Sequence, residues 1–277
     1  MYPRIKNKYT LILLPFFALI TTQAVAAALV MSAPPRESQE KGMEIYGPIA
    51  EQLSKVTGKQ VVYQHPKNWT EYAANMRADK YDIVFDGPHF AAWRMKHFHH
   101  VPVAKLPGTL GFVIIGKDSD SNVNHLRDLI GKSLCGIASP NLGTMVAFSI
   151  FNNPVIQPEI RVIKGGPGDV LKAFEKGECH YAVLLDRFYN NLPEEKKKNI
   201  KVIAKSNQMP NQTFTASVHL SKIDIDKMAS YLTTEDGAKA GNSLLARFSK
   251  KAHKFVRGDA KDYDGLENLL EGVVYGW

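Results

Sequence analysis

The chain has 277 residues, of which 44% are hydrophobic and 22% are charged, as in an ordinary soluble globular protein. This length is sufficient for two lobes of about 100–150 residues each. The formal net charge is +8, but charges of both signs alternate along the chain, and neither a long basic run nor a basic-aromatic stripe is present. This pattern argues against nucleic acid as the partner.

The first 26 residues have the parts of an export signal. A basic start precedes an apolar core at residues 11–20, and Ala24-Val25-Ala26 is a cleavage site of the A-x-A type. A membrane anchor is the alternative, but the apolar run is short for a spanning helix. No cysteine lies near the cut, so no lipid attachment is expected there. We therefore expect residues 1–26 to be a cleavable signal peptide and the mature chain to lie free in a periplasm.

Short apolar strands alternate with amphipathic helices in the first part of the mature chain. Apolar residues recur at helical spacing up to Gly58, which marks a helix end. The predicted order is strand 28–33, helix 44–57, strand 60–64, helix 69–79 and strand 81–85, with a further helix beginning near His89. This order favours a mostly parallel sheet covered by helices on both faces.

The same pattern returns further along. The predicted elements are strand 110–115, a helix at 124–130, a strand that begins at Ser133, helix 144–151, strand 160–163, helix 169–176, and strands 181–185 and 201–204. Segment 213–220 is predicted to run beside 110–115, so that two crossing strands form a hinge, and helices at 225–232, 235–248 and 262–274 complete the chain. We expect a two-lobed α/β fold with residues 29–105 and 212–277 in lobe one and 106–211 in lobe two.

The two cysteines, Cys135 and Cys179, lie at the starts of predicted strands in the same lobe. Export to a periplasm would permit a disulfide between them. Two separate, buried thiols are the alternative, which we slightly favour. Neither cysteine has a C-x-x-C partner, so a redox motif or a zinc knuckle is not expected.

Lobe two offers a candidate ligand site at the start of its helix 144–151. A strand, a small-residue loop and a helix start leave free backbone N–H groups that can bind an anion. The candidate residues are Ser139, Asn141, Gly143 and Thr144. Simple capping of the helix by Ser139 or Asn141 is the equally weighted alternative.

Lobe one offers a similar strand end at Asp86-Gly87-Pro88-His89, and Asp186 follows a strand of lobe two. Strand carboxyl ends are the usual cleft position in an open α/β sheet, so both aspartates and the Gly-Pro-His turn are candidate ligand contacts. The alternatives are a plain strand-to-helix turn and carboxylates that cap a helix or pair with Arg187.

Arg36 and Trp69 complete the candidate site. Arg36 follows the first strand and could clamp a carboxylate or phosphonate with two hydrogen bonds, although surface arginines are more often solvated. Trp69, near a loop, could line the pocket. Tyr46 and Phe90 are further lining candidates, but Tyr46 lies on the buried stripe of its helix, which favours core packing.

No pattern predicts catalysis, a metal or a cofactor. The elbow G-x-S-x-G of a serine nucleophile is absent. His97, His99 and His100 have no acidic partner nearby in the sequence, and we expect surface histidines rather than a metal site.

Five segments resemble the phosphate/phosphite/phosphonate-binding proteins of ABC transporters in order and spacing. They are residues 46–58, 81–90, 126–132, 173–182 and 262–266. The resemblance covers nearly the whole mature chain. It implies the type II periplasmic binding protein fold, in which two lobes with mostly parallel sheets are joined by two hinge strands and the ligand lies in the cleft between them.

The same resemblance implies that the chain delivers a small phosphonate-like anion or other oxyanion to an inner-membrane ABC permease, and we expect it to act as a monomer. Two departures reduce the side-chain donors for an oxyanion. Residues 139–145 replace a segment richer in Ser and Thr, and Pro167 follows Gly165-Gly166 where the family tends to have His. The alternatives are a sensing subunit for a membrane kinase and, less favoured, a hydrolase that uses the same cleft.

Overall fold

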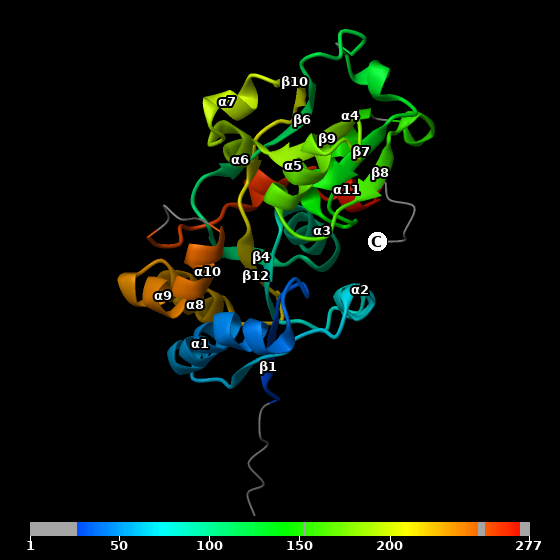
Figure 1. The fold of residues 1–277 in the computed structure, drawn as a ribbon. Coiled ribbons are helices and arrows are strands. Elements are labelled where there is room, and N and C mark those ends of the chain that lie inside the picture. Colours follow the sequence, from blue (N-terminus) through cyan, green and yellow to red (C-terminus); the bar gives the residue numbers. More distant parts are fainter. Residues whose placement is uncertain (1–26, 124, 152, 249–252, 272–277) are drawn as a thin grey trace, which may run out of the picture.

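The structure is a computed structural model that describes residues 27–123, 125–151, 153–248 and 253–271. The predicted signal peptide, residues 1–26, lies outside these ranges. Within them, no helix combines the length and the apolarity that a membrane crossing requires. Figure 1 shows two halves, each built on its own sheet, which we call lobe one and lobe two.

Lobe one is a five-stranded sheet with the order β2-β1-β3-β12-β4. Its strands are β1 (Leu29–Ser32), β2 (Val61–Tyr63), β3 (Ile83–Asp86), β4 (Val101–Lys105) and β12 (Thr213–Ala216). The helices of this lobe are α1 (Gln39–Thr57), α2 (Trp69–Arg77), α3 (Pro88–Phe98), α8 (Lys222–Leu232), α9 (Glu235–Ala240) and α10 (Asn242–Phe248). Phe85 faces the core formed with α1 and α8, whereas its neighbour Val84 faces the core formed with α2 and α3. Helices therefore cover both faces of the sheet, as predicted.

Lobe two is a five-stranded sheet with the order β10-β6-β9-β7-β8. Its strands are β6 (Phe112–Lys117), β7 (Ser133–Gly136), β8 (Glu159–Val162), β9 (Tyr181–Leu185) and β10 (Ile200–Lys205). The helices of this lobe are α4 (Leu142–Phe151), α5 (Pro167–Glu175), α6 (Asp186–Asn190) and α7 (Glu194–Lys197), and 3-10 turns lie at Leu126–Leu129 and Pro154–Ile156. Val113 and Leu184 pack against α5, while Ile114 and Val183 pack on the opposite face, where α4 lies.

The two sheets have the same plan. In lobe one, β12 alone runs against its neighbours β3 and β4, and β1, β2 and β3 are parallel. In lobe two, β6 alone runs against β9 and β10, and β7, β8 and β9 are parallel. The prediction of a two-lobed α/β fold with mostly parallel sheets is confirmed.

The hinge differs from the prediction. Segment 213–220 was expected beside 110–115, but β12 pairs with β3 and β4 inside lobe one. All four residues of β12 are buried, which suits an interior strand of that sheet. The antiparallel pair between the lobes is β5 (Thr109–Leu110) with β11 (Met209–Pro210), just before these chain segments enter β6 and β12.

Several element boundaries also differ from the prediction. Helix α1 begins five residues earlier than expected because Ser38 caps it, with Lys41 N donating to Ser38 Oγ at 3.3 Å. Strand β4 was not predicted; it contains Pro102, which is tolerated because β4 is an edge strand. The predicted helix 235–248 is divided into α9 and α10 at Gly241, where a Cβ would lie 2.5 Å from the Phe255 ring.

Only part of the predicted C-terminal helix, residues 262–274, is helical in the structure. The structure has a 3-10 turn at Ala260–Tyr263 and helix α11 at Asn268–Glu271, and the remainder of the predicted helix lies outside the described residues. Helix α11 packs against both α3 and α4.

Cys135 and Cys179 form a disulfide, with their Cα atoms 5.6 Å apart. Cys135 lies in β7 and Cys179 just before the adjacent parallel strand β9. The preference for two separate thiols was therefore wrong, because the pairing of β7 with β9 brings the two strand starts together.

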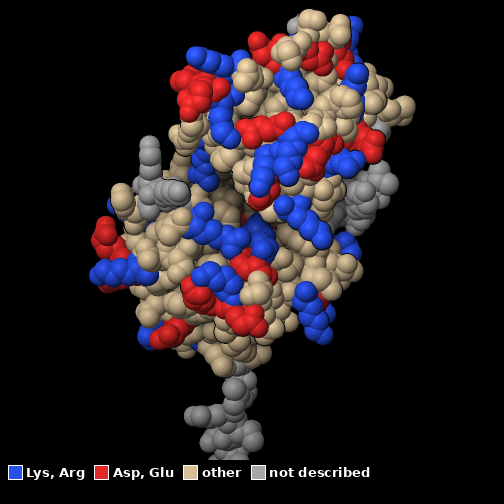
Figure 2. Space-filling view, in the orientation of Figure 1, with Lys and Arg blue, Asp and Glu red and all other residues tan. Residues whose placement is uncertain are grey.

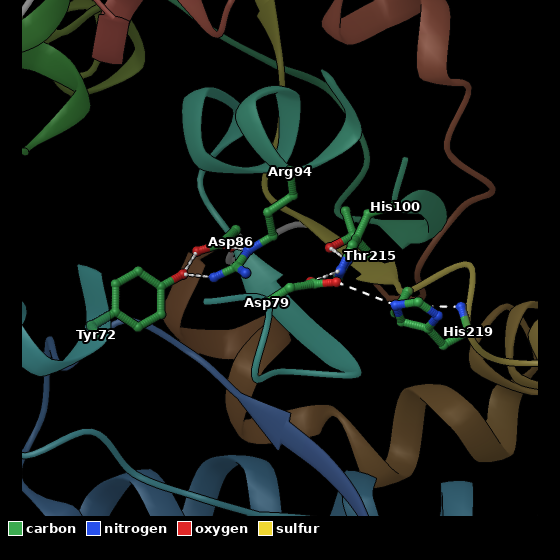
Figure 3. Close-up of polar contacts among 8 residues, drawn as sticks. Tyr72, Asp79, Asp86, Arg94, His100, Thr215 and His219 are labelled. Atoms are coloured by element: carbon green, nitrogen blue, oxygen red, sulfur yellow. Dashed lines mark hydrogen bonds and ion pairs between the residues drawn. The ribbon is translucent and has the colours of Figure 1, made fainter. Parts of the chain in front are cut away.

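A buried ion pair lies where β3 ends (Figure 3). Asp86 and Arg94 are fully buried, and Arg94 Nε donates to Asp86 Oδ2 at 2.8 Å. The Tyr72 hydroxyl donates to Asp86 Oδ1 and accepts from Arg94 Nη2 at 3.0 Å. The three side chains tie α2, β3 and α3 together directly beneath the Gly87-Pro88 turn.

His100 belongs to a second polar group in the same region (Figure 3). Only 2% of its surface is exposed, so the expectation of a surface histidine was wrong for this residue, while His97 and His99 are exposed. A carboxylate only accepts, so His100 Nε2 donates to Asp79 Oδ1 at 3.2 Å, and Nδ1 accepts from the Thr215 hydroxyl at 3.3 Å. Burial lowers the pKa of His100 to about 4.

Removing the disulfide should destabilise the protein. The bond closes a loop of 44 residues, and we expect Cys135→Ala with Cys179→Ala to lower the free energy of unfolding by about 2–4 kcal/mol. Urea denaturation followed by circular dichroism measures the change. The wild-type chain in a strong reductant is the control and should unfold at the same urea concentration as the double variant; unchanged midpoints in both would contradict the expectation.

Breaking the buried ion pair should destabilise the protein more than removing it completely. Asp86→Asn leaves the Arg94 charge buried without its counter-ion, and we expect a loss of about 3–5 kcal/mol in the free energy of unfolding. The double variant Asp86→Leu with Arg94→Met should lose less, since neither charge remains. Equal losses for the single and double variants in urea denaturation would rule out this explanation.

Protonation of His100 should destabilise the folded chain in mild acid. Its folded pKa of about 4 lies below the ordinary value of 6.5, so the full stabilisation is present above pH 6.5 and is lost as the pH falls towards 4. Over that window, His100 should contribute a slope of up to about 1.4 kcal/mol per pH unit. Denaturation of His100→Gln across this pH range should show a shallower slope than the wild type, and an unchanged slope would disprove the assignment.

Candidate functional site

The loops that could bind a ligand follow the carboxyl ends of four parallel strands. Residues 33–38 follow β1, Gly87 follows β3, residues 137–141 follow β7, and Asp186 follows β9. Ligands of open α/β sheets bind beyond these strand ends. Figure 2 shows a hollow between the two lobes, bordered by Lys and Arg side chains.

The two lobes meet through polar contacts at these loops. His89 Nε2 lies 3.0 Å from the carbonyl oxygen of Pro140, and this contact is buried. Arg187 Nη2 donates to the carbonyl oxygen of Phe248 at 2.6 Å. The Gly87-Pro88-His89 turn of lobe one therefore faces the 139–141 loop of lobe two, as the candidate site requires.

The start of α4 is held by its own side chains. Asn141 Oδ1 accepts from Gly143 N at 3.0 Å, and the Asn141 carbonyl accepts from Met145 N at 3.0 Å. The buried Thr144 hydroxyl donates to the Ile137 carbonyl and braces the loop. The capping alternative thus has direct support at Asn141. Ligand binding by Asn141, Gly143 and Thr144 stays a prediction. The same holds for Ser139, which is half-buried.

Arg36 projects from the β1–α1 loop towards the same turn. Its Nη1 atom is buried and has no hydrogen-bond partner among the described residues, and neither has the hydroxyl of Tyr46. The two groups interact directly, although without a hydrogen bond of normal geometry: burial raises the pKa of the Tyr46 phenol, and the charge and the hydrogen-bonding groups of Arg36 oppose this rise. The guanidinium also lies over the Phe248 ring, 5.9 Å from its centre. Arg36 is thus held in place while one nitrogen remains available.

His89 stands beside Arg36. It is 2% exposed, and its Nδ1 atom has no hydrogen-bond partner among the described residues. A Cβ at Gly87 would lie 3.1 Å from His89 Nδ1 and 3.7 Å from Arg36 Nη2, so both nitrogens lie close to Gly87. Burial, assisted by the charge of Arg36, lowers the pKa of His89 to about 4 despite its bond to Pro140.

These three groups, Arg36 Nη1, Tyr46 Oη and His89 Nδ1, are buried polar atoms without protein partners. Leaving such groups unpaired costs free energy, so an arrangement that places them in one region is suited to a polar ligand. Sequence reasoning assigned Tyr46 to the core, and its ring is fully buried there. Its position on a buried helical stripe gave no sign that the hydroxyl would remain unpaired.

Other candidate residues have protein partners. Asp86 is engaged by Arg94 and Tyr72, as described above, and contacts no open space. Trp69 stacks on Phe90 with ring centres 6.1 Å apart and belongs to the aromatic cluster of lobe one. Asp186 accepts from Gln208 Nε2 at 2.7 Å and from the backbone N–H of Arg187 at 2.5 Å. Because these three side chains already have protein partners, their positions do not favour the predicted contacts with a ligand.

The charge balance at the gap is positive. Arg247 pairs with Glu37, whose side chain is 3% exposed and whose Oε2 atom has no partner among the described residues. Burial, together with the nearby Arg36, lowers the pKa of Arg247. With Arg36 and Arg187 also present, more cations than anions border this part of the gap, which favours an anionic ligand.

The described residues contain no group of three His, Cys, Asp or Glu side chains placed to hold a metal ion. A hollow of about 560 Å³ lies at the other end of α4, lined by Leu126, Arg127, Ile150 and Phe151 among others. It contains none of the unpartnered polar atoms described above.

Comparison with known proteins agrees with this arrangement. A family model described as "ABC transporter, phosphonate, periplasmic substrate-binding protein" matches residues 31–263. No curated protein sequence matches the chain.

Solved structures show the same fold. PhnD1 from Prochlorococcus marinus, in complex with methylphosphonate, is 16% identical, with 89% of this chain and 99% of that chain covered and a TM-score of 0.64. A binding protein component of an ABC phosphonate transporter from Pseudomonas aeruginosa is 18% identical and has a TM-score of 0.57. The alignment covers 88% of this chain and 85% of the Pseudomonas chain. A Xanthomonas citri protein bound to ATP is 13% identical, covers 88% and 96% of the two chains, and has a TM-score of 0.66. Since the family match extends over most of the sequence, the chain belongs to the phosphonate-type periplasmic substrate-binding proteins of ABC transporters.

Proposed function

We propose that the gap between the lobes binds a small phosphorus oxyanion of the phosphonate, phosphite or phosphate type. The observation that carries the proposal is the buried Nη1 atom of Arg36, which has no hydrogen-bond partner of normal geometry among the described residues and lies beside the Tyr46 hydroxyl. A guanidinium forms its strongest hydrogen bonds with the oxygen atoms of such anions. Methylphosphonate bound to PhnD1 supports the choice of ligand class.

Ligand capture would act through closure of the lobes. A ligand that contacts Arg36 in lobe one and the start of α4 in lobe two gains both sets of contacts only when the lobes are closed, so binding favours that state. Residues 29–105 with 212–277 would move as one body relative to 106–211. The functional state would then be the closed, ligand-bound form, and the protein would carry out no chemical reaction.

Several finer features belong to the same proposal. A cleavable signal peptide at residues 1–26 would direct the chain to the periplasm, where it would act as a monomer and deliver its ligand to an inner-membrane ABC permease. Of the unpartnered groups at the gap, the Arg36 guanidinium and the Tyr46 phenol can donate hydrogen bonds to an anion. We propose neither an enzymatic role nor nucleic acid as a ligand, and the family match favours transport over sensing.

Titration calorimetry with methylphosphonate, phosphite and phosphate tests the ligand class, and acetate serves as a carboxylate comparison. At least one phosphorus oxyanion should bind, and more tightly than acetate. Arg36→Met removes the guanidinium but keeps an apolar side chain, and it should weaken binding about 10- to 100-fold, as expected for loss of a charged hydrogen bond.

Arg161→Met is the matched control. Arg161 is an exposed arginine on the edge strand β8, so this variant changes the net charge by the same amount. Its affinity should equal that of the wild type. Absence of binding by every phosphorus oxyanion, or equal affinity in Arg36→Met and the wild type, would refute the proposal.

A further inference from the structure

The imidazole of His89 has a defined tautomer because of the contact between the lobes. A carbonyl oxygen can only accept, so the 3.0 Å contact with Pro140 requires a hydrogen on Nε2. A neutral ring then has a lone pair and no hydrogen on Nδ1. The ring is 2% exposed and lies beside the Arg36 cation, and with its pKa lowered to about 4 it is neutral at neutral pH.

Nδ1 of His89 is therefore a buried acceptor that has no donor. Among the described residues no group donates to it, although Arg36 Nη2 also lies close to Gly87. The other charged group that acts on the ring is the Asp86 carboxylate, which already has Tyr72 and Arg94 as partners. A donor nitrogen and an acceptor nitrogen thus both lie close to Gly87: Arg36 offers hydrogen atoms, and His89 Nδ1 requires one.

We propose that this pair selects an oxyanion that carries its own proton, with Arg36 binding a charged oxygen and His89 Nδ1 accepting the hydrogen of a neighbouring P–OH group. The inference rests on the proposed function and adds the protonation state of the ligand. An alkylphosphonate monoanion has both kinds of oxygen. A sulfonate of the same shape has three oxygen acceptors and no proton, so its oxygen would face the lone pair of Nδ1.

Methylphosphonate and methanesulfonate are the probes for this inference. Calorimetry is carried out at a mildly acidic pH, below the second ionisation of an alkylphosphonate and above the His89 pKa of about 4. The wild-type chain should prefer methylphosphonate by about 10- to 100-fold, because the sulfonate leaves a buried acceptor unpaired.

Two substitutions of His89 separate its two nitrogens. His89→Gln places an amide near the position of Nε2, so it can still reach Pro140 but offers no acceptor at Nδ1; the preference should fall to within about threefold, the range of a contact that no longer discriminates. His89→Asn places an amide near Nδ1 and gives up the contact with Pro140. It should bind both probes more weakly and still prefer the phosphonate.

Glu37 provides the control, because its Oε2 atom is the other unpartnered acceptor close to Arg36 in the chain. Glu37→Gln removes that negative charge and should leave the ratio of the two affinities unchanged. Loss of the preference in Glu37→Gln but not in His89→Gln would assign the proton acceptor to Glu37 and overturn the inference.

The outcomes distinguish the inference from the proposed function. If neither probe nor any other phosphorus oxyanion binds the wild type, the proposed function fails and the inference falls with it. If both probes bind equally tightly, the proposed function stands and the inference alone is wrong. Nitrogen-15 shifts of the His89 ring, assigned by comparison with His89→Gln, give a readout without ligand: an Nε2–H tautomer is expected, and a charged ring or an Nδ1–H tautomer at neutral pH would overturn the inference.

Discussion

The hydrogen bond from His89 to the carbonyl of Pro140 is the contact on which the arrangement of the gap depends. It joins the first turn of α3 in lobe one to the loop before α4 in lobe two. Because the acceptor is a carbonyl, the bond also determines which ring nitrogen carries hydrogen. The contact therefore joins the two lobes and also determines the hydrogen-bonding character of His89 at the gap.

The turn that carries His89 rests on a buried ion pair. Asp86 ends β3, and Arg94 reaches back from α3 to its carboxylate, with Tyr72 bridging the two. A pair of this kind contributes little net stability, because desolvation opposes the attraction between the charges. Its effect is to fix the direction in which α3 leaves the sheet, since any other geometry would leave a charge buried alone. The position of His89 follows from that direction.

The two lobes contribute different chemistry to the gap although their sheets share one plan. Lobe one presents side chains with unpaired polar atoms, those of Arg36, Tyr46 and His89. Lobe two presents the start of α4, where Asn141 and Thr144 are already occupied by local hydrogen bonds. Under the proposed function, a ligand that contacted both walls would depend on both lobes, which is the requirement for closure on binding.

The sequence by itself determined the class of fold and indicated where a candidate site was expected. Hydrophobic periodicity identified most strands and helices, because it reflects which residues must be buried within one element. The Gly-Pro turn after β3 and the small-residue loop after β7 were visible for the same local reason. Edge strand β4 with its Pro102 was missed, and β12 was given the wrong neighbour, because strand pairing is not encoded in the periodicity of a single segment.

Only the tertiary structure decided which polar groups remained unpaired. Arg94 lies in a different element from Asp86, and no local sequence pattern predicts that the two side chains form an ion pair. Cys135 and Cys179 became partners only when β7 and β9 paired. Tyr46 and His89 look like ordinary core and turn residues in the sequence, and their free polar atoms emerge only after every neighbour has been placed. Two side chains on different elements can pair only if they lie close together in space. The distance between two elements is determined by how they pack, and the sequence of neither element encodes it.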